Sequence, residues 1–98
     1  MIGLRQTEIF RDWLAVLRDK QAAAIIRRRI TRLELGNFGD TKTIGGGVGE
    51  LRIDFGPGYR LYFTRRGQEV VILLCGGDKR SQDADIARAK ILAKEHVS

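Results

Sequence analysis

The sequence predicts an α+β fold, because helical and strand periodicities occupy separate segments of the chain. Two alternating runs of apolar and polar residues flank the triplet Gly56-Pro57-Gly58, which is typical of a β-hairpin. A nearly continuous apolar run from Glu69 to Cys75 predicts a central strand with little solvent on either face. Three further segments repeat apolar residues at helical spacing, so we expect two helices before the hairpin and one at the C-terminus.

Length and composition limit the class of protein. The 98 residues suffice for one modest core, and we expect a single domain over residues 1–98. No apolar run approaches the ~20 residues that span a bilayer, and the N-terminus lacks the apolar region of a secretory signal. The single cysteine, Cys75, excludes a disulfide framework within the chain, so we expect a cytoplasmic protein. The net charge of +6 favours a polyanion, an anionic membrane surface or an acidic protein as partner.

The first part of the chain predicts a short strand and a helix. Residues 2–6 alternate weakly and form a candidate edge strand, and Thr7 can cap a helix that runs to about Asp19. Apolar residues repeat at helical spacing in this helix, and we assign them to the core rather than to a base-stacking surface: Phe10, Trp13, Leu14 and Leu17.

A second helix is expected from Lys20 to Leu35, with Gly36-Asn37 as its stop and an antiparallel arrangement against the first helix. One face is apolar, through Ala23, Ile26, Ile30 and Leu33. The rest is crowded by Arg27, Arg28, Arg29 and Arg32. These arginines form either a solvated face, favoured near the helix C-terminus by the helix dipole, or a basic ridge for rRNA or an acidic partner.

Glycine runs in the remainder of the chain predict a loop and the end of a strand. A loop from Asn37 to Val48 holds one short strand near residues 42–44, and no Gly-Lys-Ser/Thr follows Gly45-Gly46-Gly47, which excludes a P-loop. Gly76-Gly77 is expected to end the apolar strand. Ser81 then opens a last helix that runs to about Glu95.

The predicted hairpin has an apolar face and a polar face. A three-residue loop at residues 56–58 would place Asp54 opposite Arg60 and Arg52 opposite Tyr62. Two arginines, a carboxylate and a phenol then share one face, a composition suited to holding phosphate. The apolar face contains Leu51, Ile53, Phe55, Tyr59, Leu61 and Phe63.

Strand register predicts where the cations gather. A turn at Arg66-Gly67 would pair Arg60 with Leu73, so that the Lys79-Arg80 segment emerges near Arg60 and Arg52. Clustered like charges are destabilising unless an anion lies among them. The alternative is that Asp54 neutralises Arg60 and Asp78 neutralises Lys79, with no ligand.

Three stretches of the chain resemble the RelE/ParE toxin superfamily and, more narrowly, its phage-derived, HigB-like addiction module killer branch. They are residues 5–19, the hairpin run that ends in Gly-Pro-Gly-Tyr-Arg-Leu-Tyr-Phe, and the run from Leu73 to Ala89. The resemblance covers nearly the whole chain. It implies a short N-terminal strand, a helical hairpin, a mostly antiparallel sheet of three or four strands and a C-terminal helix.

The resemblance also implies a function. RelE-like members cut mRNA on the ribosome without a metal or cofactor, so it implies a type II toxin that inhibits translation. The implied partners are mRNA, the ribosome and a cognate antitoxin with a helix-turn-helix part, which would form a hetero-oligomer with the toxin. ParE-like members instead inhibit DNA gyrase without cleavage, and a noncatalytic nucleic-acid-binding module is a third possibility; the basic residues favour the ribonuclease.

Matching the motifs residue by residue implies a site. Arg60 and Arg80 would hold the scissile phosphate, with Lys79 as general acid. Arg52 would orient the substrate, with Tyr62 and Gln82 as secondary contacts. The aromatic residue usual near the start of the last helix has no counterpart here, so the general base stays open. No Cys/His/Asp cluster has metal-ligand spacing, and we expect no metal.

Overall fold

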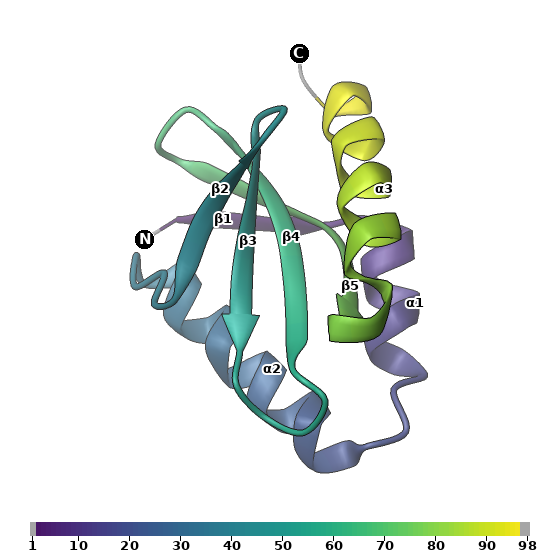
Figure 1. Cartoon of the computed structure of the whole chain (residues 1–98). Coiled ribbons are helices and arrows are strands. Elements are labelled where there is room, and N and C mark those ends of the chain that lie inside the picture. Colours follow the sequence, from purple (N-terminus) through teal and green to yellow (C-terminus); the bar gives the residue numbers. More distant parts are fainter. Residues whose placement is uncertain (1, 97–98) are drawn as a thin grey trace.

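The structure is a computed structural model that describes residues 2–96. A five-stranded sheet lies between two helical layers (Figure 1). The strand order is β1-β5-β4-β3-β2; β1 runs parallel to β5, and the other neighbouring strands are antiparallel. The predicted α+β fold is confirmed, with more strands than the three or four expected. The elements are β1 Gly3–Gln6, α1 Glu8–Ala15, α2 Lys20–Glu34, β2 Thr41–Gly45, β3 Val48–Ile53, β4 Tyr59–Arg66, β5 Val70–Asp78, the 3-10 turn η1 Lys79–Ser81 and α3 Gln82–Glu95.

Helices α1 and α2 cover one face of the sheet, and α3 covers the other (Figure 1). The larger apolar cluster lies under α1 and α2, and a smaller one lies under α3. Within the described residues, no helix combines the length and apolar character needed to cross a bilayer.

Capping residues set the bounds of α1 and α2. The Thr7 hydroxyl accepts a hydrogen bond from Phe10 N at 3.0 Å and donates to Leu74 O at 2.6 Å, which ties the start of α1 to β5. Helix α1 ends at Ala15 rather than near Asp19, because Asp19 caps α2 by accepting from Gln21 N and Ala22 N. One residue cannot both continue the first helix and cap the second.

Helix α2 confirms its predicted extent and its apolar stripe, since Ala23, Ile26, Ile30 and Leu33 are all buried. Its C-terminus is closed by two hydrogen bonds of the Schellman type, from Gly36 N to Leu33 O and from Asn37 N to Arg32 O, both 2.9 Å long. The predicted stop at Gly36-Asn37 is therefore correct.

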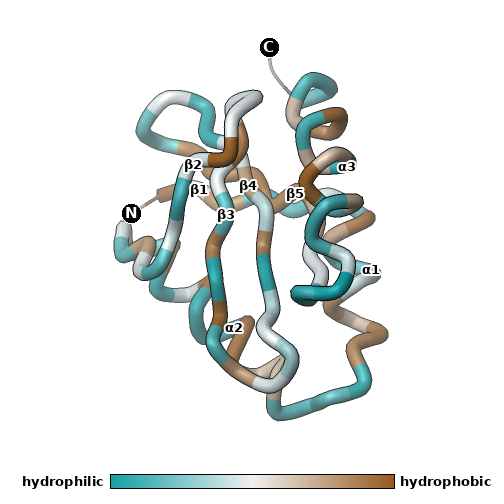
Figure 2. Tube along the Cα trace, in the orientation of Figure 1, coloured by the Kyte–Doolittle hydropathy of each residue, from teal (hydrophilic) through white to brown (hydrophobic). Residues whose placement is uncertain are grey.

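Strands β3 and β4 alternate between apolar and polar residues as predicted (Figure 2). The apolar side chains Leu51, Ile53, Tyr59, Leu61 and Phe63 lie in the cluster under α1 and α2. The polar side is not open, however, because α3 packs over part of it and buries Glu50 and Tyr62 completely.

Strand β5 continues through the two glycines that were expected to end it and reaches Asp78. Both glycines lie in close contact with side chains from the helical layers. A Cβ atom on Gly76 would lie 2.5 Å from the Trp13 ring, and one on Gly77 would overlap the Asp85 carboxylate. The glycines therefore let α1 and α3 approach the same point of β5 rather than terminating it.

Helix α3 begins after the short turn η1. The Asp78 carboxylate caps that turn by accepting from Arg80 N at 2.9 Å. Ser81 precedes α3 but makes no capping hydrogen bond; its hydroxyl donates to Asp85 at 2.6 Å instead. Ala89 and Ala93 are buried where α3 packs against the sheet.

Candidate functional site

The loop between β3 and β4 is longer than predicted, and this changes which residues face each other. Residues 54–58 form the loop, closed by hydrogen bonds from Phe55 N to Ile53 O and from Gly58 N to Phe55 O, each 3.0 Å long. Arg52 consequently lies opposite Arg60, not opposite Tyr62. The predicted pairing of Asp54 with Arg60 is wrong for the same reason.

The pairing of β4 with β5 also differs from the prediction. Arg60 lies opposite Gly77 rather than Leu73, because the turn lies at residues 67–69 and pairs Arg66 with Val70, and because the register shifts again between Tyr62 and Phe63. The shift is an irregularity of the bulge type, which a sequence pattern does not reveal. Its consequence is that Arg60 lies directly beside the last residues of β5, just before Lys79.

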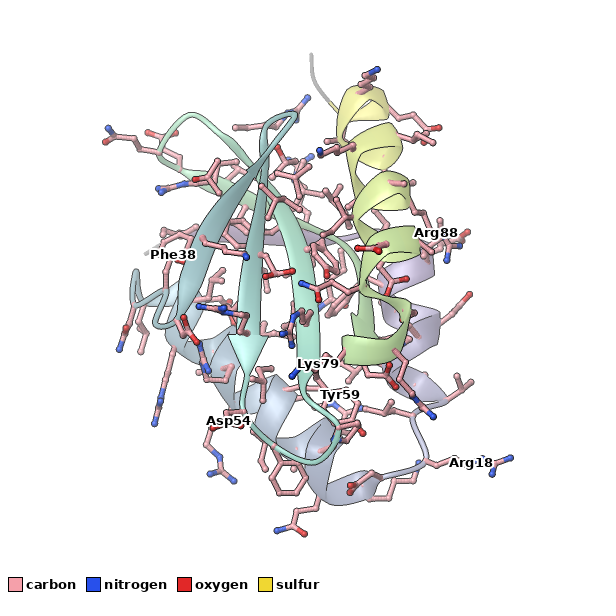
Figure 3. The ribbon with its side chains drawn as sticks, viewed as in Figure 1. Arg18, Phe38, Asp54, Tyr59, Lys79 and Arg88 are labelled. Carbon is pink, nitrogen blue, oxygen red and sulfur yellow. The ribbon has the colours of Figure 1, made fainter. Side chains whose placement is uncertain are left out.

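Cations from three parts of the chain line one cavity of about 400 Å³ at the β3–β4 loop. They are Arg52 on β3, Arg60 on β4 and Lys79 in the turn after β5. Lys79 and Asp54 lie at this end of the sheet (Figure 3). Asp40 and Asp54 also line the cavity, so its side-chain charge is not purely positive. We call this cavity the cationic pocket.

Arg80, the fourth predicted cation, is not among the residues that line the cationic pocket. Its guanidinium is exposed and forms an ion pair with Asp78 at 2.9 Å. Hydrogen bonding from Arg80 lowers the pKa of the Asp78 carboxyl, and the same contact raises the pKa of Arg80. The expectation that Asp78 neutralises Lys79 is therefore wrong; its partner is Arg80.

Arg52 is oriented by a carboxylate and by a second arginine. The Arg52 guanidinium donates to Asp40 Oδ1 at 3.1 Å. The guanidinium of Arg29, on α2, donates to Arg52 O at 3.3 Å and to Phe38 O at 3.4 Å. Arg29 thus holds the segment that carries Asp40 against β3. Arg29 is half-buried, whereas the other three arginines of α2 are exposed: Arg27, Arg28 and Arg32.

A buried carboxylate, Glu50 on β3, lies behind the cationic pocket. Its Oε2 accepts hydrogen bonds from the Tyr62 hydroxyl and from Gln82 Nε2, both at 3.0 Å. Arg60 Nε lies 3.7 Å from the same oxygen. The side chain of Arg60 is only 13% exposed, so this ion pair is largely removed from water. We call Glu50 with these three partners the Glu50 network.

The second oxygen of Glu50 is in a different situation. Oε1 is buried and has no hydrogen-bond partner among the described residues. The ammonium of Lys42, on the edge strand β2, lies 4.0 Å from it and is half exposed. A buried carboxylate oxygen without a partner is uncommon and is a candidate for chemistry. Within residues 2–96, Lys42 is the cation that forms an ion pair with this oxygen.

Tyr62 and Gln82, both predicted substrate contacts, belong to this interior. Tyr62 is fully buried, so the structure does not present it to a substrate. Burial raises the pKa of Tyr62 well above its ordinary value, and the hydrogen bond to the Glu50 carboxylate raises it further. Both side chains position Glu50 from the α3 side of the sheet.

Residues 12–96 match the family described as "Phage derived protein Gp49-like". The chain belongs to this family. A relative from Haemophilus influenzae, described as an uncharacterized protein, is 51% identical over 94 residues, which are 96% of this chain and 95% of the relative.

Comparison with solved structures shows which fold this Gp49-like chain has. A variant of the E. coli toxin RelE with two arginines replaced by alanine, solved in the free state, superposes with a TM-score of 0.73 at 14% identity and covers 98% of both chains. The conserved hypothetical protein HP0894 of Helicobacter pylori gives 0.53 at 20% identity, over 82% of this chain and 97% of that one. The RelE-like fold implied by the sequence resemblance is confirmed.

The sequence of this Gp49-like chain pointed to part of the site only. Alternation placed Arg52 and Arg60 on one polar face, and the end of β5 brought Lys79 to them. Glu50 shares that face, which was the available signal for it, but its burial depends on where α3 packs. Lys42 gave no signal, because its role depends on the pairing of β2 with β3. Among residues 2–96, no group of three or more His, Cys, Asp or Glu side chains is placed to hold a metal ion.

Proposed function

We propose that this chain is the toxin of a type II toxin–antitoxin system and inhibits translation by metal-independent cleavage of mRNA on the ribosome. The observation that carries the proposal is the cationic pocket, in which Arg52, Arg60 and Lys79 meet on a RelE-like fold. Guanidinium and ammonium groups held in place before the substrate arrives are suited to stabilising charge that develops on a phosphate.

Cleavage proceeds by attack of the RNA 2′-oxygen on the adjacent phosphorus. The bond from that oxygen to phosphorus forms, the bond to the 5′-oxygen breaks, and the products are a 2′,3′-cyclic phosphate and a 5′-hydroxyl. Arg60 stabilises the negative charge of the phosphorane, and Arg52 orients the phosphate. Lys79 gives a proton to the leaving 5′-oxygen.

The proton of the 2′-hydroxyl needs an acceptor, and of the carboxylates in and beside the pocket we assign this role to Glu50. Its Oε1 has no hydrogen-bond partner among residues 2–96, and Arg60, whose Nε lies 3.7 Å from the other oxygen, links the carboxylate to the pocket. Because Glu50 is buried, the Lys42 side chain must move aside before substrate reaches that oxygen. Tyr62 and Gln82 then act as positioning residues, since they hold the other oxygen.

Arg80 contacts the phosphate in this proposal only after it leaves Asp78. Its guanidinium is 84% exposed, and an exposed ion pair of this kind contributes little free energy, so RNA can compete for it. Gln82 contributes through Glu50 rather than by direct contact.

The proposal includes the protein partners and the compartment. A cognate antitoxin, with a helix-turn-helix part for DNA, binds the toxin as a hetero-oligomer in the cytoplasm and prevents it from reaching the ribosome. The exposed arginines of α2, which lie away from the cationic pocket, are available to an acidic segment of such a partner.

The test is primer extension on mRNA translated by purified ribosomes with the purified protein. We expect cuts in phase with ribosome position and a loss of about 10²-fold or more in cleavage rate for Arg60→Ala. The matched control is Arg28→Ala, which removes the same charge from exposed α2 and should cleave normally. Arg60→Lys keeps a cation beside Glu50, so it separates loss of phosphate recognition from loss of folding.

Two results would contradict the proposal. Undiminished cleavage by folded Arg60→Ala removes the pocket from the mechanism. Inhibition of DNA supercoiling without any RNA cuts points instead to the ParE-like gyrase inhibitor.

A further inference from the structure

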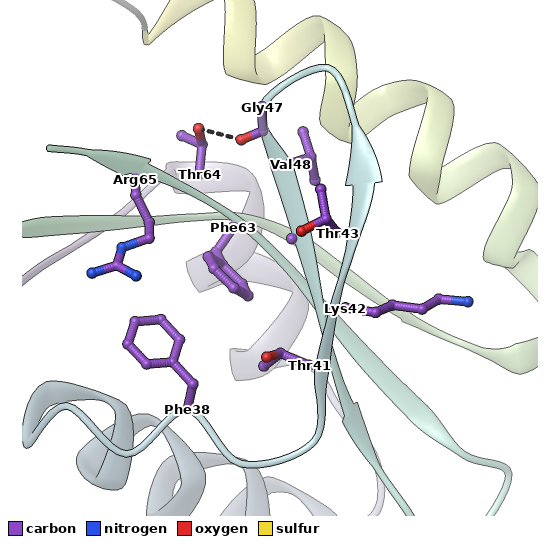
Figure 4. A pocket seen from close by; sticks show the side chains of 10 residues that line it. Phe38, Thr41, Lys42, Thr43, Gly47, Val48, Phe63, Thr64 and Arg65 are labelled. Carbon is purple, nitrogen blue, oxygen red and sulfur yellow. Dashed lines mark hydrogen bonds between the residues drawn. The ribbon is translucent and has the colours of Figure 1, made fainter. Parts of the chain in front are cut away.

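A second cavity, of about 350 Å³, is lined by the β2–β3 hairpin, by β4 and by the loop that follows α2 (Figure 4). Its floor includes Phe63, which belongs to the apolar cluster under α1 and α2. Helix α2 ends at Glu34, before this part of the sheet, and the loop that follows α2 supplies Phe38 as a wall. The cavity is thus open between that loop and the β2–β3 hairpin.

Aromatic rings and an arginine form its walls. The rings of Phe38 and Phe63 have centroids 5.7 Å apart and are tilted by 47°. The Arg65 guanidinium carbon lies 4.7 Å from the centroid of the Phe38 ring. Gly49 makes room for this arrangement, because a Cβ atom there would lie 2.5 Å from the Phe63 ring. The ring of Phe63 can therefore lie across β3.

The polar groups of the cavity are hydroxyls and a cation. Thr41 and Thr43 project from alternate positions of β2 on the same face, and Arg65 adds a positive charge. Lys42 also borders the cavity, but its side chain extends away from it (Figure 4). No carboxylate is among the described residues of the lining, in contrast to the cationic pocket with its Asp40 and Asp54.

A half-buried Phe38 ring, hydroxyls at the edge and an arginine without a lining carboxylate match a planar ring that carries polar edges and a phosphate. Phe63, which is buried, forms the base of the cavity. Nucleobases stack on aromatic rings and on guanidinium planes in single-stranded RNA recognition. An aliphatic side chain of a protein partner would use neither the hydroxyls nor the cation. The chemistry of the cavity therefore favours a nucleotide.

The segment from Phe38 to Lys42 connects the two cavities. Phe38 and Thr41 line the cavity described here, whereas Asp40, between them in sequence, lines the cationic pocket and holds Arg52. An RNA strand in the cationic pocket can pass this segment at the open edge of the sheet, since β2 is the last strand. We propose that the Phe38–Arg65 cavity binds a base of single-stranded RNA that flanks the nucleotide held in the cationic pocket. This inference rests on the proposed function for its ligand, RNA.

The experiment measures binding of a fluorescent RNA hexamer whose 2′-oxygens are methylated, so that it lacks the nucleophile and stays intact. Fluorescence anisotropy at fixed salt gives its affinity for the whole chain. We expect Phe38→Ala to weaken binding about tenfold, the usual scale for loss of one stacked base. Because Phe38 also packs against the core, Phe38→Leu tests the ring with less change in volume and should weaken binding as well.

Matched controls exist beside both residues. Arg65→Gln should weaken binding more than Arg66→Gln, which removes the same charge from the next residue, in the lining of a different cavity. Leu35→Ala removes an exposed apolar side chain just after α2 and should leave affinity unchanged. Thermal unfolding of each variant confirms that the folded protein is being compared.

Equal effects of Arg65→Gln and Arg66→Gln, or full affinity of folded Phe38→Ala and Phe38→Leu, would overturn the inference. Intact RNA binding together with loss of a protein complex in Phe38→Ala would also overturn it and assign the cavity to a protein partner. The inference and the proposed function fail separately. Base binding that depends on Phe38 without any ribosomal cleavage refutes only the function, and Arg60-dependent cleavage without an effect of Phe38 refutes only the cavity.

Discussion

The face of the sheet under α1 and α2 is filled by apolar side chains, whereas the face under α3 also buries the Glu50 network. Apolar packing is non-directional and tolerates small errors of register. A buried carboxylate with a partly buried arginine is favourable only when its hydrogen bonds are in place. The first face therefore supplies general stability, and the second holds charged groups at defined positions beside the cationic pocket.

The largest effect should come from Glu50→Ala, which leaves Arg60 partly buried without its carboxylate. We expect the free energy of unfolding in urea to fall by about 3–5 kcal/mol. Glu50→Gln keeps hydrogen-bonding groups and should lose less. Glu69→Ala is the control, since Glu69 is exposed in the β4–β5 turn and should change stability by no more than about 0.5 kcal/mol. If Glu50→Ala behaves like this control, the contrast between the faces is wrong.

The apolar face should respond next. Leu61 is fully buried under α1 and α2, and Leu61→Ala removes buried methyl groups and leaves a cavity. We expect a loss of about 3 kcal/mol in the same urea measurement. Ile91→Ala, at a side chain 61% exposed on α3, serves as the control and should be nearly neutral. A loss at Leu61 no greater than at Ile91 would be inconsistent with a core on this face.

Removing one hydroxyl oxygen from a tyrosine on each face compares the stability that the two faces derive from it. Tyr62→Phe removes the hydroxyl that donates to Glu50, and hydrogen bonds to charged groups support a loss of about 2 kcal/mol. Tyr59 belongs to the cluster under α1 and α2, and its hydroxyl has no hydrogen-bond partner in the part of the chain that the structure describes. Tyr59→Phe should thus leave unfolding in urea nearly unchanged. Equal losses for both variants would show that the Tyr62 hydroxyl contributes nothing specific.

The smallest effect is a pH dependence on the α3 face. Burial raises the pKa of the Cys75 thiol to about 11 from an ordinary value of 9.0, so the unfolded chain ionises first. The stability contribution of the neutral thiol is complete below pH 9 and is lost as pH rises toward 11. Linkage predicts that wild type loses about 1 kcal/mol more than Cys75→Ala between pH 8 and pH 10, measured by urea unfolding. Parallel losses would mean that the thiol ionises without penalty.

Most of the fold could be predicted from local sequence patterns. The caps at Thr7 and Gly36, the apolar stripe of α2 and the two faces of the hairpin follow from neighbouring residues, and the structure confirms them. The pairing register of β3 with β4 could not be predicted in this way. The Gly56-Pro57-Gly58 triplet is compatible with a three-residue loop and with the observed loop of residues 54–58. The two registers differ by two residues, which leaves every side chain on the same face, so alternation does not decide between them.

The residues of the candidate site also fall into those that local patterns predict and those that depend on long-range placement. Arg52, Arg60 and Lys79 were predictable because strand alternation and the end of β5 bring them together. The pairing of Asp78 with Arg80 instead of Lys79 depends on the conformation of the η1 turn. Glu50 and the Phe38–Arg65 cavity depend on the placement of α3 and of a loop without regular structure, which no local pattern specifies.

The adjacent glycines of β5 are the point at which two helices contact one strand from opposite sides. The indole of Trp13 presses on one side of the strand at Gly76, and the carboxylate of Asp85 presses on the other side at Gly77. Two helices from opposite ends of the chain are thereby seated on neighbouring residues of one strand. The same short piece of backbone therefore fixes the positions of both helices relative to Lys79, which directly follows it.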